Sequence, residues 1–159
     1  MAADALRYLW RDVVIAGGFA ALLSGIPSTL YALVTGGDVM EATRAAGAML
    51  IPPTSNDAEL LTAAALVHAA VSLFWTLILI PLLPHRHTVA WAVLALAGIA
   101  VLDLRAIGLL FPEIYALSFW PQFADHLAFG AILGSVLEYR RNRRQKPPSC
   151  TECDPRRGY

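Results

Sequence analysis

The sequence has little charge, and this shortage argues against an ordinary soluble domain. Only 15% of its 159 residues are charged, whereas soluble domains usually carry about 25%. No charged residue occurs from Val13 to Gly37 or from Leu60 to Pro84. The net charge is zero, so the overall charge suggests neither a nucleic-acid nor an acidic partner. Both cysteines, Cys150 and Cys153, lie near the C-terminus.

Common catalytic signatures are also missing. The sequence contains no nucleophile elbow, no phosphate-binding glycine loop and no carboxylate dyad, and Gly17-Gly18 lies inside an apolar run instead of forming a dinucleotide fingerprint. These absences disfavour an enzyme and leave its chemistry unassigned. The N-terminal segment also lacks a signal-peptide layout, since Asp4 and Asp12 flank its arginines. We therefore expect the first apolar segment to be retained.

Long apolar runs take the place of these features. Hydrophobic residues make up 57% of the chain, and a helix of roughly 20 apolar residues crosses a hydrocarbon core. The sequence predicts an all-α integral membrane four-helix bundle over residues 1–138, followed by a basic, disordered tail over residues 139–159. The predicted spans cover residues 13–34, 58–83, 89–111 and 114–137.

The longest connection, residues 35–58, predicts one short extra helix. Asp38 and Glu41 have the spacing of a capping box, and the proline pair at 52–53 ends a helix that begins near Val39. This helix is too short and too polar to cross a bilayer. Asn56 is then placed to cap the next span through its spacing to Glu59.

The distribution of basic residues predicts the orientation. In a four-span topology, the N-terminus, the 85–88 turn and the tail share one side, which carries every lysine and arginine outside the spans except Arg44. Both termini are therefore expected in the cytoplasm of a bacterial inner membrane. The basic cluster from Arg140 to Lys146 is expected to anchor this topology and to contact anionic lipid headgroups.

Ionisable residues within the spans form a predicted polar layer. Counted from the outer ends of their spans, His68, Asp103, Asp125 and His126 lie roughly 13–18 Å deep at 1.5 Å per residue. Such residues usually pair and face other helices. The expected pairs are His68 or His126 with Asp103, and Arg105 with Asp125. Alternatively, Arg105 extends towards the outer interface.

Small residues predict close helix packing. Gly17 and Gly25 belong to one stripe of the first span, and Gly130 and Gly134 share a stripe with His126 in the last span. Pro27 predicts a kink in the first span.

Ser24 and Ser28 flank this kink and are candidates to satisfy the backbone groups that it frees.

Several functions fit this layer. One function is helix assembly, in which the layer joins the helices of a structural or accessory subunit through hydrogen bonds. The other is a binding site for a proton, an ion or a small solute. Haem ligation by His68 and His126 and divalent metal binding by the layer are weaker alternatives, and no cofactor is predicted. The apolar inner halves of spans 2 and 4 disfavour an open channel.

The tail leaves two further alternatives open. Cys150 and Cys153 form a CxxC, which is half of a zinc site that a homo-oligomer can complete. An unstructured tail with reduced thiols is the simpler interpretation.

Three segments also carry a family resemblance: SGIPSTLYAL in the first span, His68-x-x-x-Ser72-x-x-Trp75 in the second and Ala124-Asp-His-Leu-Ala-Phe-Gly130 in the fourth. Together they resemble small four-helix bacterial inner-membrane proteins of the YagU type, over roughly residues 13–138. The resemblance implies a location in the bacterial inner membrane and no particular activity.

Overall fold

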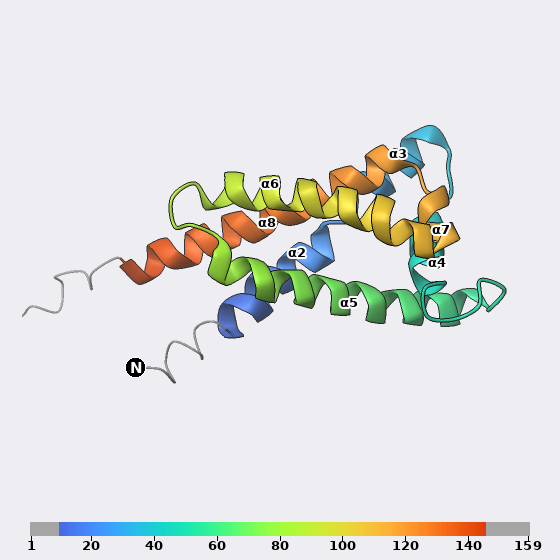
Figure 1. Ribbon diagram of the computed structural model, residues 1–159, viewed down its shortest axis with the longest axis horizontal. Helices are drawn as coiled ribbons and strands as arrows, with labels where there is room; N and C mark the ends of the chain where they lie inside the picture. Colours follow the sequence, from blue (N-terminus) through green and yellow to red (C-terminus); the bar gives the residue numbers. More distant parts are fainter. Residues whose placement is uncertain (1–9, 146–159) are drawn as a thin grey trace, which may run out of the picture.

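The computed structural model describes residues 10–145, and every regular element in this range is helical (Figure 1). The first long helix runs from Trp10 to Thr35, and its parts after Asp12 are η1 (Val13–Gly17), α2 (Gly18–Leu23) and α3 (Ile26–Thr35). The elements that follow it are α4 (Glu41–Gly47), α5 (Asp57–Leu82), α6 (Thr88–Val101), η2 (Leu102–Ile107), η3 (Gly108–Leu110), α7 (Pro112–Ala116) and α8 (Phe119–Gln145).

Three of these helical segments are long and apolar enough to cross a membrane: Trp10–Thr35, Asp57–Leu82 and Thr88–Leu110. Their bounds lie within three residues of the first three predicted spans. The fourth long helix, α8, has 27 residues. Gln122, Asp125 and His126 interrupt its apolar sequence.

The last predicted span, residues 114–137, differs from the observed helix α8 at both ends. Residues 112–116 form the separate helix α7, because the backbone becomes extended at Leu117 and α8 begins only at Phe119. At its other end, α8 continues to Gln145. Residues 139–145, which the sequence placed in a disordered tail, are therefore helical. The remaining tail lies outside the described residues.

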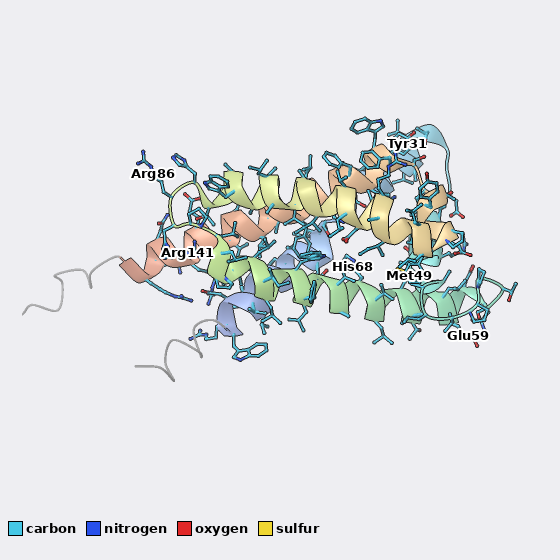
Figure 2. All side chains as sticks on the ribbon, viewed as in Figure 1. Tyr31, Met49, Glu59, His68, Arg86 and Arg141 are labelled. Atoms are coloured by element: carbon cyan, nitrogen blue, oxygen red, sulfur yellow. The ribbon has the colours of Figure 1, made fainter. Side chains whose placement is uncertain are left out.

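The long helices have two different ends. Figure 1 shows the start of the first helix, the connection between α5 and α6 and the end of α8 at one side of the molecule. We call this the basic end, because it carries Arg86 and the arginines of α8 (Figure 2). The opposite end carries α4 and α7 and is called the α4 end.

Glycines allow the closest helix contacts. A Cβ on Gly134 would lie 2.6 Å from Val89 Cα, and one on Gly130 would lie 2.8 Å from Ala92 O, so α8 touches the backbone of α6. A Cβ on Gly17 would meet the side chain of Thr76 on α5 at 2.9 Å. Gly25 differs from this expected pattern, because nothing lies within 4 Å of a Cβ there.

An apolar core fills the half of the molecule nearest the basic end. Its largest fully buried apolar side chains are Val13 of η1 and Leu133 and Leu137 of α8. Leu79 and Leu83, at the end of α5, belong to the same buried cluster. Side chains packed in this way fill the space between the helices in this half of the molecule.

Charged contacts close the basic end. Asp12 is only 6% exposed, and its Oδ1 accepts hydrogen bonds from Arg140 Nε at 2.7 Å and Arg144 Nη2 at 2.5 Å. Arg141 donates to Ile80 O at 3.3 Å and Leu83 O at 3.4 Å. These two carbonyl groups lie at the end of α5, where no following helical turn supplies N–H donors for them. Three arginines of the predicted lipid anchor thus make contacts within the protein.

Helix α4 packs against the beginning of α5. A Cβ on Gly47 would overlap Leu60 O, so the two backbones touch. Arg44 binds Asp57 and Asp38, and these hydrogen bonds raise the pKa of Arg44 above its usual value, with the bond to Asp57 contributing most.

The predicted cap at Asn56 is confirmed. Its Oδ1 accepts from Glu59 N at 3.0 Å at the start of α5.

Candidate functional site

The candidate site begins at a break in the first long helix. Helix α2 ends at Leu23 and α3 begins at Ile26, next to Pro27, which has no N–H to donate. Ser28 Oγ donates to Gly25 O at 3.2 Å, and Ser24 Oγ reaches Ala21 O at 3.5 Å. The predicted kink at Pro27 is thus confirmed. The two serines bind carbonyls other than that of Leu23, which is the one that loses its N–H partner to Pro27.

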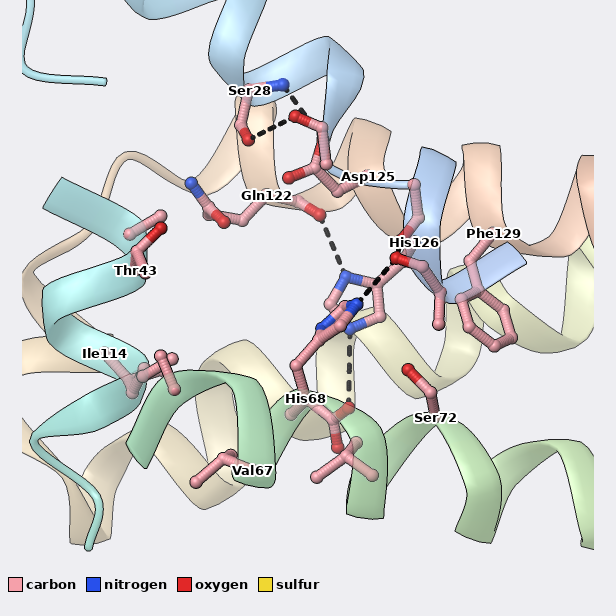
Figure 3. A pocket seen from close by; sticks show the side chains of 18 of the residues that line it. Ser28, Thr43, Val67, His68, Ser72, Ile114, Gln122, Asp125, His126 and Phe129 are labelled. Carbon is pink, nitrogen blue, oxygen red and sulfur yellow. Dashed lines mark hydrogen bonds and ion pairs between the residues drawn. The ribbon is translucent and has the colours of Figure 1, made fainter. Parts of the chain in front are cut away.

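Two other helices complete the hydrogen bonding at this break (Figure 3). From α5, His68 Nε2 lies 2.8 Å from Ala21 O, close to the end of α2. From α8, Asp125 Oδ1 accepts from Ser28 N at 2.9 Å, in the first turn of α3. A carboxylate is favourable at this position because the N-terminus of a helix has free N–H groups and a partial positive charge.

A second pair joins α8 to η2. His126 Nδ1 lies 2.9 Å from Gln122 O, one turn earlier in α8, and His126 Nε2 lies 3.4 Å from Asp103 Oδ2. Both side chains are mostly buried, with 24% of His126 and 17% of Asp103 exposed. Asp103 lies in the π-helical turn η2, and π-helical turns often occur at functional sites. The expected pairing of a histidine with Asp103 is present here.

Arg105 does not join these residues. Its guanidinium carbon lies 4.7 Å from the centre of the Phe119 ring and 6.0 Å from that of Tyr115. The expected pair with Asp125 is not formed, because Asp125 is bound to the N–H of Ser28 and Arg105 packs over aromatic rings near α7. This position agrees with the alternative that Arg105 extends towards the outer end.

A cavity of about 940 Å³ lies between these helices. It exists because α5 packs against α4, η1 and α2 but only weakly against α6 and α8. Figure 2 shows His68 pointing from α5 into the space between the helices. The titratable residues that line the cavity are His68, Asp103, Asp125 and His126.

Uncharged polar and aromatic side chains complete the cavity wall. Gln122 and Ser72 add hydrogen-bonding groups, and Phe74, Trp75 and Phe129 provide aromatic surface. A mainly apolar cavity with a few converging polar groups is the usual form of a small-molecule site.

Sequence reasoning found the four titratable residues but missed much of their setting. Their common depth in the predicted spans was the signal, and the structure brings them to one cavity. Gln122 was missed because it belongs to the aromatic start of α8 and has no titratable group. The link between Asp125 and the break at Pro27 was also missed, since the two residues are far apart in sequence and no local pattern joins them.

The cofactor alternatives gain no support from the geometry. Among residues 10–145, no three side chains of His, Cys, Asp or Glu lie together in a group that could hold a metal ion. The Nε2 atoms of His68 and His126 face Ala21 O and Asp103 instead of a shared axial position. The zinc hypothesis concerns Cys150 and Cys153, which lie outside the described residues.

These observations define the class of the protein: a helical chain with three helices suited to membrane spanning and a mainly apolar cavity in which a few polar groups converge. No family model matches the chain, and comparison with curated proteins and with solved structures finds no similar protein. The resemblance to proteins of the YagU type therefore stays a prediction.

Proposed function

We propose that the chain is a four-span bacterial inner-membrane protein whose cavity binds a small solute. The single observation that carries the proposal is the convergence of four titratable side chains on one cavity of about 940 Å³. Ionisable groups are costly inside a bilayer, so their grouping around a space large enough for a small molecule favours a binding site. Helix α8 supplies the fourth span, because its glycines seat it along α6.

The orientation follows from the basic residues. With four spans, the basic end faces the cytoplasm and both termini are cytoplasmic, since Arg44 and Arg105 are the only basic residues in the other half of the described chain. The cavity then lies in the outer half of the membrane. It is lined partly by α4, which covers the outer side.

The apolar core near the cytoplasmic side argues for a binding pocket and against an open channel. Leu133 and Leu137 are fully buried, and Leu79 and Leu83 are nearly so. Between the cavity and the basic end, where Asp12 and Thr88 are buried, the buried polar residue of the described chain is Thr76, whose hydroxyl has no hydrogen-bond partner. A solute that enters the cavity therefore meets a closed inner half.

A structural role in assembly is the second candidate, and a different observation favours it. His68 and Asp125 both bind the backbone of the broken first helix. In a bilayer these backbone groups have no water to bind, so side chains from neighbouring helices stabilise the break. This role explains His68 and Asp125 but does not require a cavity.

Cysteine accessibility tests the proposal against this alternative. Ser72 and Thr76 lie one turn apart on the same face of α5; Ser72 lines the cavity, and Thr76 packs against Gly17. In a background with Cys150→Ser and Cys153→Ser, we expect Ser72→Cys to react with a small, water-soluble maleimide. Thr76→Cys is the matched control and is expected to stay unreactive. The reagent is applied to intact cells, so it also reports the outward location of the cavity.

The outcomes separate the two candidates. Reaction at position 72 alone supports a cavity that solutes reach from outside. Absence of reaction at position 72, in a protein that folds and inserts, contradicts the binding proposal and favours assembly. A control cysteine at Thr54, in the loop before α5, is expected to react from outside, and one at Arg86 only after the cells are opened. The reverse pattern would overturn the orientation.

A further inference from the structure

The proton positions on His126 determine the charge of one side of the cavity. Gln122 O is only an acceptor, so His126 Nδ1, at 2.9 Å from it, carries a hydrogen. Nε2 then faces Asp103 Oδ2 at 3.4 Å, and a hydrogen bond between these two atoms needs one further proton. Whichever atom holds this proton, the pair of His126 and Asp103 has no net charge.

His68 also uses one ring hydrogen for a backbone contact. Its Nε2 lies 2.8 Å from Ala21 O and must donate to this carbonyl. One ring hydrogen satisfies that contact, so this hydrogen bond does not require a positive charge on the ring. The hydrogen bonds of the two histidines and Asp103 can thus all form without any net charge from these three residues.

Asp125 is the residue whose charge is not balanced. The hydrogen bonds that it accepts come from Ser28, which is uncharged (Figure 3). Among residues 10–145, Asp125 forms no ion pair, and no lysine or arginine lines the cavity. The nearest candidate from the sequence, Arg105, is bound over Phe119 and Tyr115. An ionised Asp125 therefore gives the cavity one net negative charge in a mostly apolar setting.

Aromatic side chains line the same space. Phe74 and Trp75 come from α5, and Phe129 comes from α8. The faces of aromatic rings attract cations, and a carboxylate together with aromatic walls is a common way to bind an ammonium group. The cavity volume of about 940 Å³ is within the usual range for small organic ligands.

We propose that the cavity binds an organic cation, an amine or quaternary ammonium group carried on an apolar body. The positive charge lies at Asp125, and the apolar body lies against Phe74, Trp75 and Phe129. This inference rests on the proposed function, because it requires that a solute reaches the cavity. It adds the charge and the shape of the solute.

Binding of benzyltrimethylammonium to the purified full chain tests the inference. Trp75 is the tryptophan that lines the cavity, so a variant with Trp10, Trp91 and Trp120 replaced by Phe gives a local fluorescence signal. We expect saturable quenching by benzyltrimethylammonium and at least tenfold weaker binding of neopentylbenzene, in which a carbon atom replaces the charged nitrogen. Benzenesulfonate, an anion of similar size, is expected not to bind.

Asp125→Asn isolates the charge, because the amide oxygen can still accept from Ser28 N. We expect this variant to bind the cation at least tenfold more weakly and Asp125→Glu to keep the preference for the cation. Asp57→Asn, on the exposed start of α5, is the matched control and leaves the affinity unchanged. Thermal unfolding of each variant shows whether it is folded.

The contradicting outcomes differ from those of the accessibility experiment. Equal binding of the cation and its neutral isostere to the wild-type protein overturns the inference, whatever the variants do. Undiminished binding by folded Asp125→Asn also overturns it. If Ser72→Cys reacts with the maleimide and no cation binds, the cavity is accessible to solutes as proposed, and only the assignment of a cation as its ligand is contradicted. If Ser72→Cys does not react, the proposed function itself fails.

Discussion

The two halves of the molecule differ in how their helices pack against one another. At the basic end, η1, α5, α6 and α8 enclose a buried apolar cluster, and a carboxylate with three arginines closes it. At the α4 end, α5 separates from α6 and α8, and a cavity of about 940 Å³ takes the place of a core. The comparison teaches that hydrophobic sequence alone does not produce dense packing.

The difference follows from where small and polar residues lie. Near the basic end, Gly134 lets the backbones of α8 and α6 touch, and Gly17 lets the first helix approach the side chain of Thr76. At the α4 end, the break at Gly25 and Pro27 interrupts the first helix, and polar side chains must reach it from α5 and α8. Each of these side chains brings a polar group into the interior, so the helices there cannot close on an apolar core. Substitutions at the two ends should therefore act differently.

The largest effect is expected at the contact between α6 and α8. Gly134→Leu places a side chain where even a Cβ would lie 2.6 Å from Val89 Cα. Because backbone cannot move aside as a side chain can, we expect a loss of about 3 kcal/mol in the free energy of unfolding. Denaturation in mixed micelles, followed by circular dichroism, measures this loss.

Gly98→Leu is the matched control, since nothing lies within 4 Å of a Cβ at Gly98 on α6. It is expected to leave stability unchanged or to raise it by up to about 1 kcal/mol, because glycine is a poor helix former. Equal losses at Gly134 and Gly98 would show that the two helices do not pack as described.

We expect the second largest loss of stability when the buried carboxylate at the basic end is removed. Asp12→Ala leaves Arg140 and Arg144 without their shared acceptor. The cost of leaving a buried charge such as that of Arg140 unpaired is about 3–5 kcal/mol, and partial exposure of its guanidinium reduces the expected loss to about 2 kcal/mol. The same unfolding measurement applies.

Asp38→Ala is the control for this change, because it removes an exposed carboxylate that also binds an arginine. Exposed ion pairs contribute little, so we expect a much smaller loss in the free energy of unfolding than for Asp12→Ala. A loss at Asp38 as large as that at Asp12 would remove the contrast between the two ends.

A smaller loss of stability is expected in the polar layer at the α4 end. His126→Leu removes the partner of Asp103, and the cost of leaving a buried polar group unsatisfied is about 1–3 kcal/mol. Because Asp103 lines an open cavity that water or solute can enter, we expect about 1 kcal/mol. Membrane insertion should be unaffected, which fractionation of the expressed protein shows.

A loss of 3 kcal/mol or more would indicate that the α4 end is as tightly packed as the basic end. The test is sharpened by Ala92→Leu, a control near Gly130 in the packed half, where a fully buried small residue leaves no room for a larger side chain. This control is expected to lose more stability than His126→Leu.

The smallest effect is expected at the turn between α5 and α6. His87 has a φ angle of 58°, in the left-handed region that disfavours side chains. His87→Gly removes this strain of about 1 kcal/mol but adds freedom to the unfolded chain, so the net change should stay within about 0.5 kcal/mol. Arg86→Gly, where no such strain is relieved, is expected to be more destabilising in the same unfolding assay.

The long helices could be predicted from the sequence because their signals are local. Runs without charge define the first three segments to within a few residues, and Asn56 with Glu59 marks the start of α5. The predicted beginning of the fourth helix was wrong, because the apolar run continues through residues 114–118 although the backbone becomes extended at Leu117. The predicted end of this helix was also wrong, because residues 139–145 make their contacts with Asp12 and the end of α5, which are distant in the sequence.

The sequence by itself determined which segments are helical and which residues are too polar for an apolar interior, because both depend on neighbours along the chain. Only the tertiary structure decided that Asp125 binds the broken first helix while Arg105 packs over aromatic rings. It also decided that the space beside Asp125 stays open. Pairing between distant side chains depends on how helices separate and rotate, and no spacing within one helix specifies that.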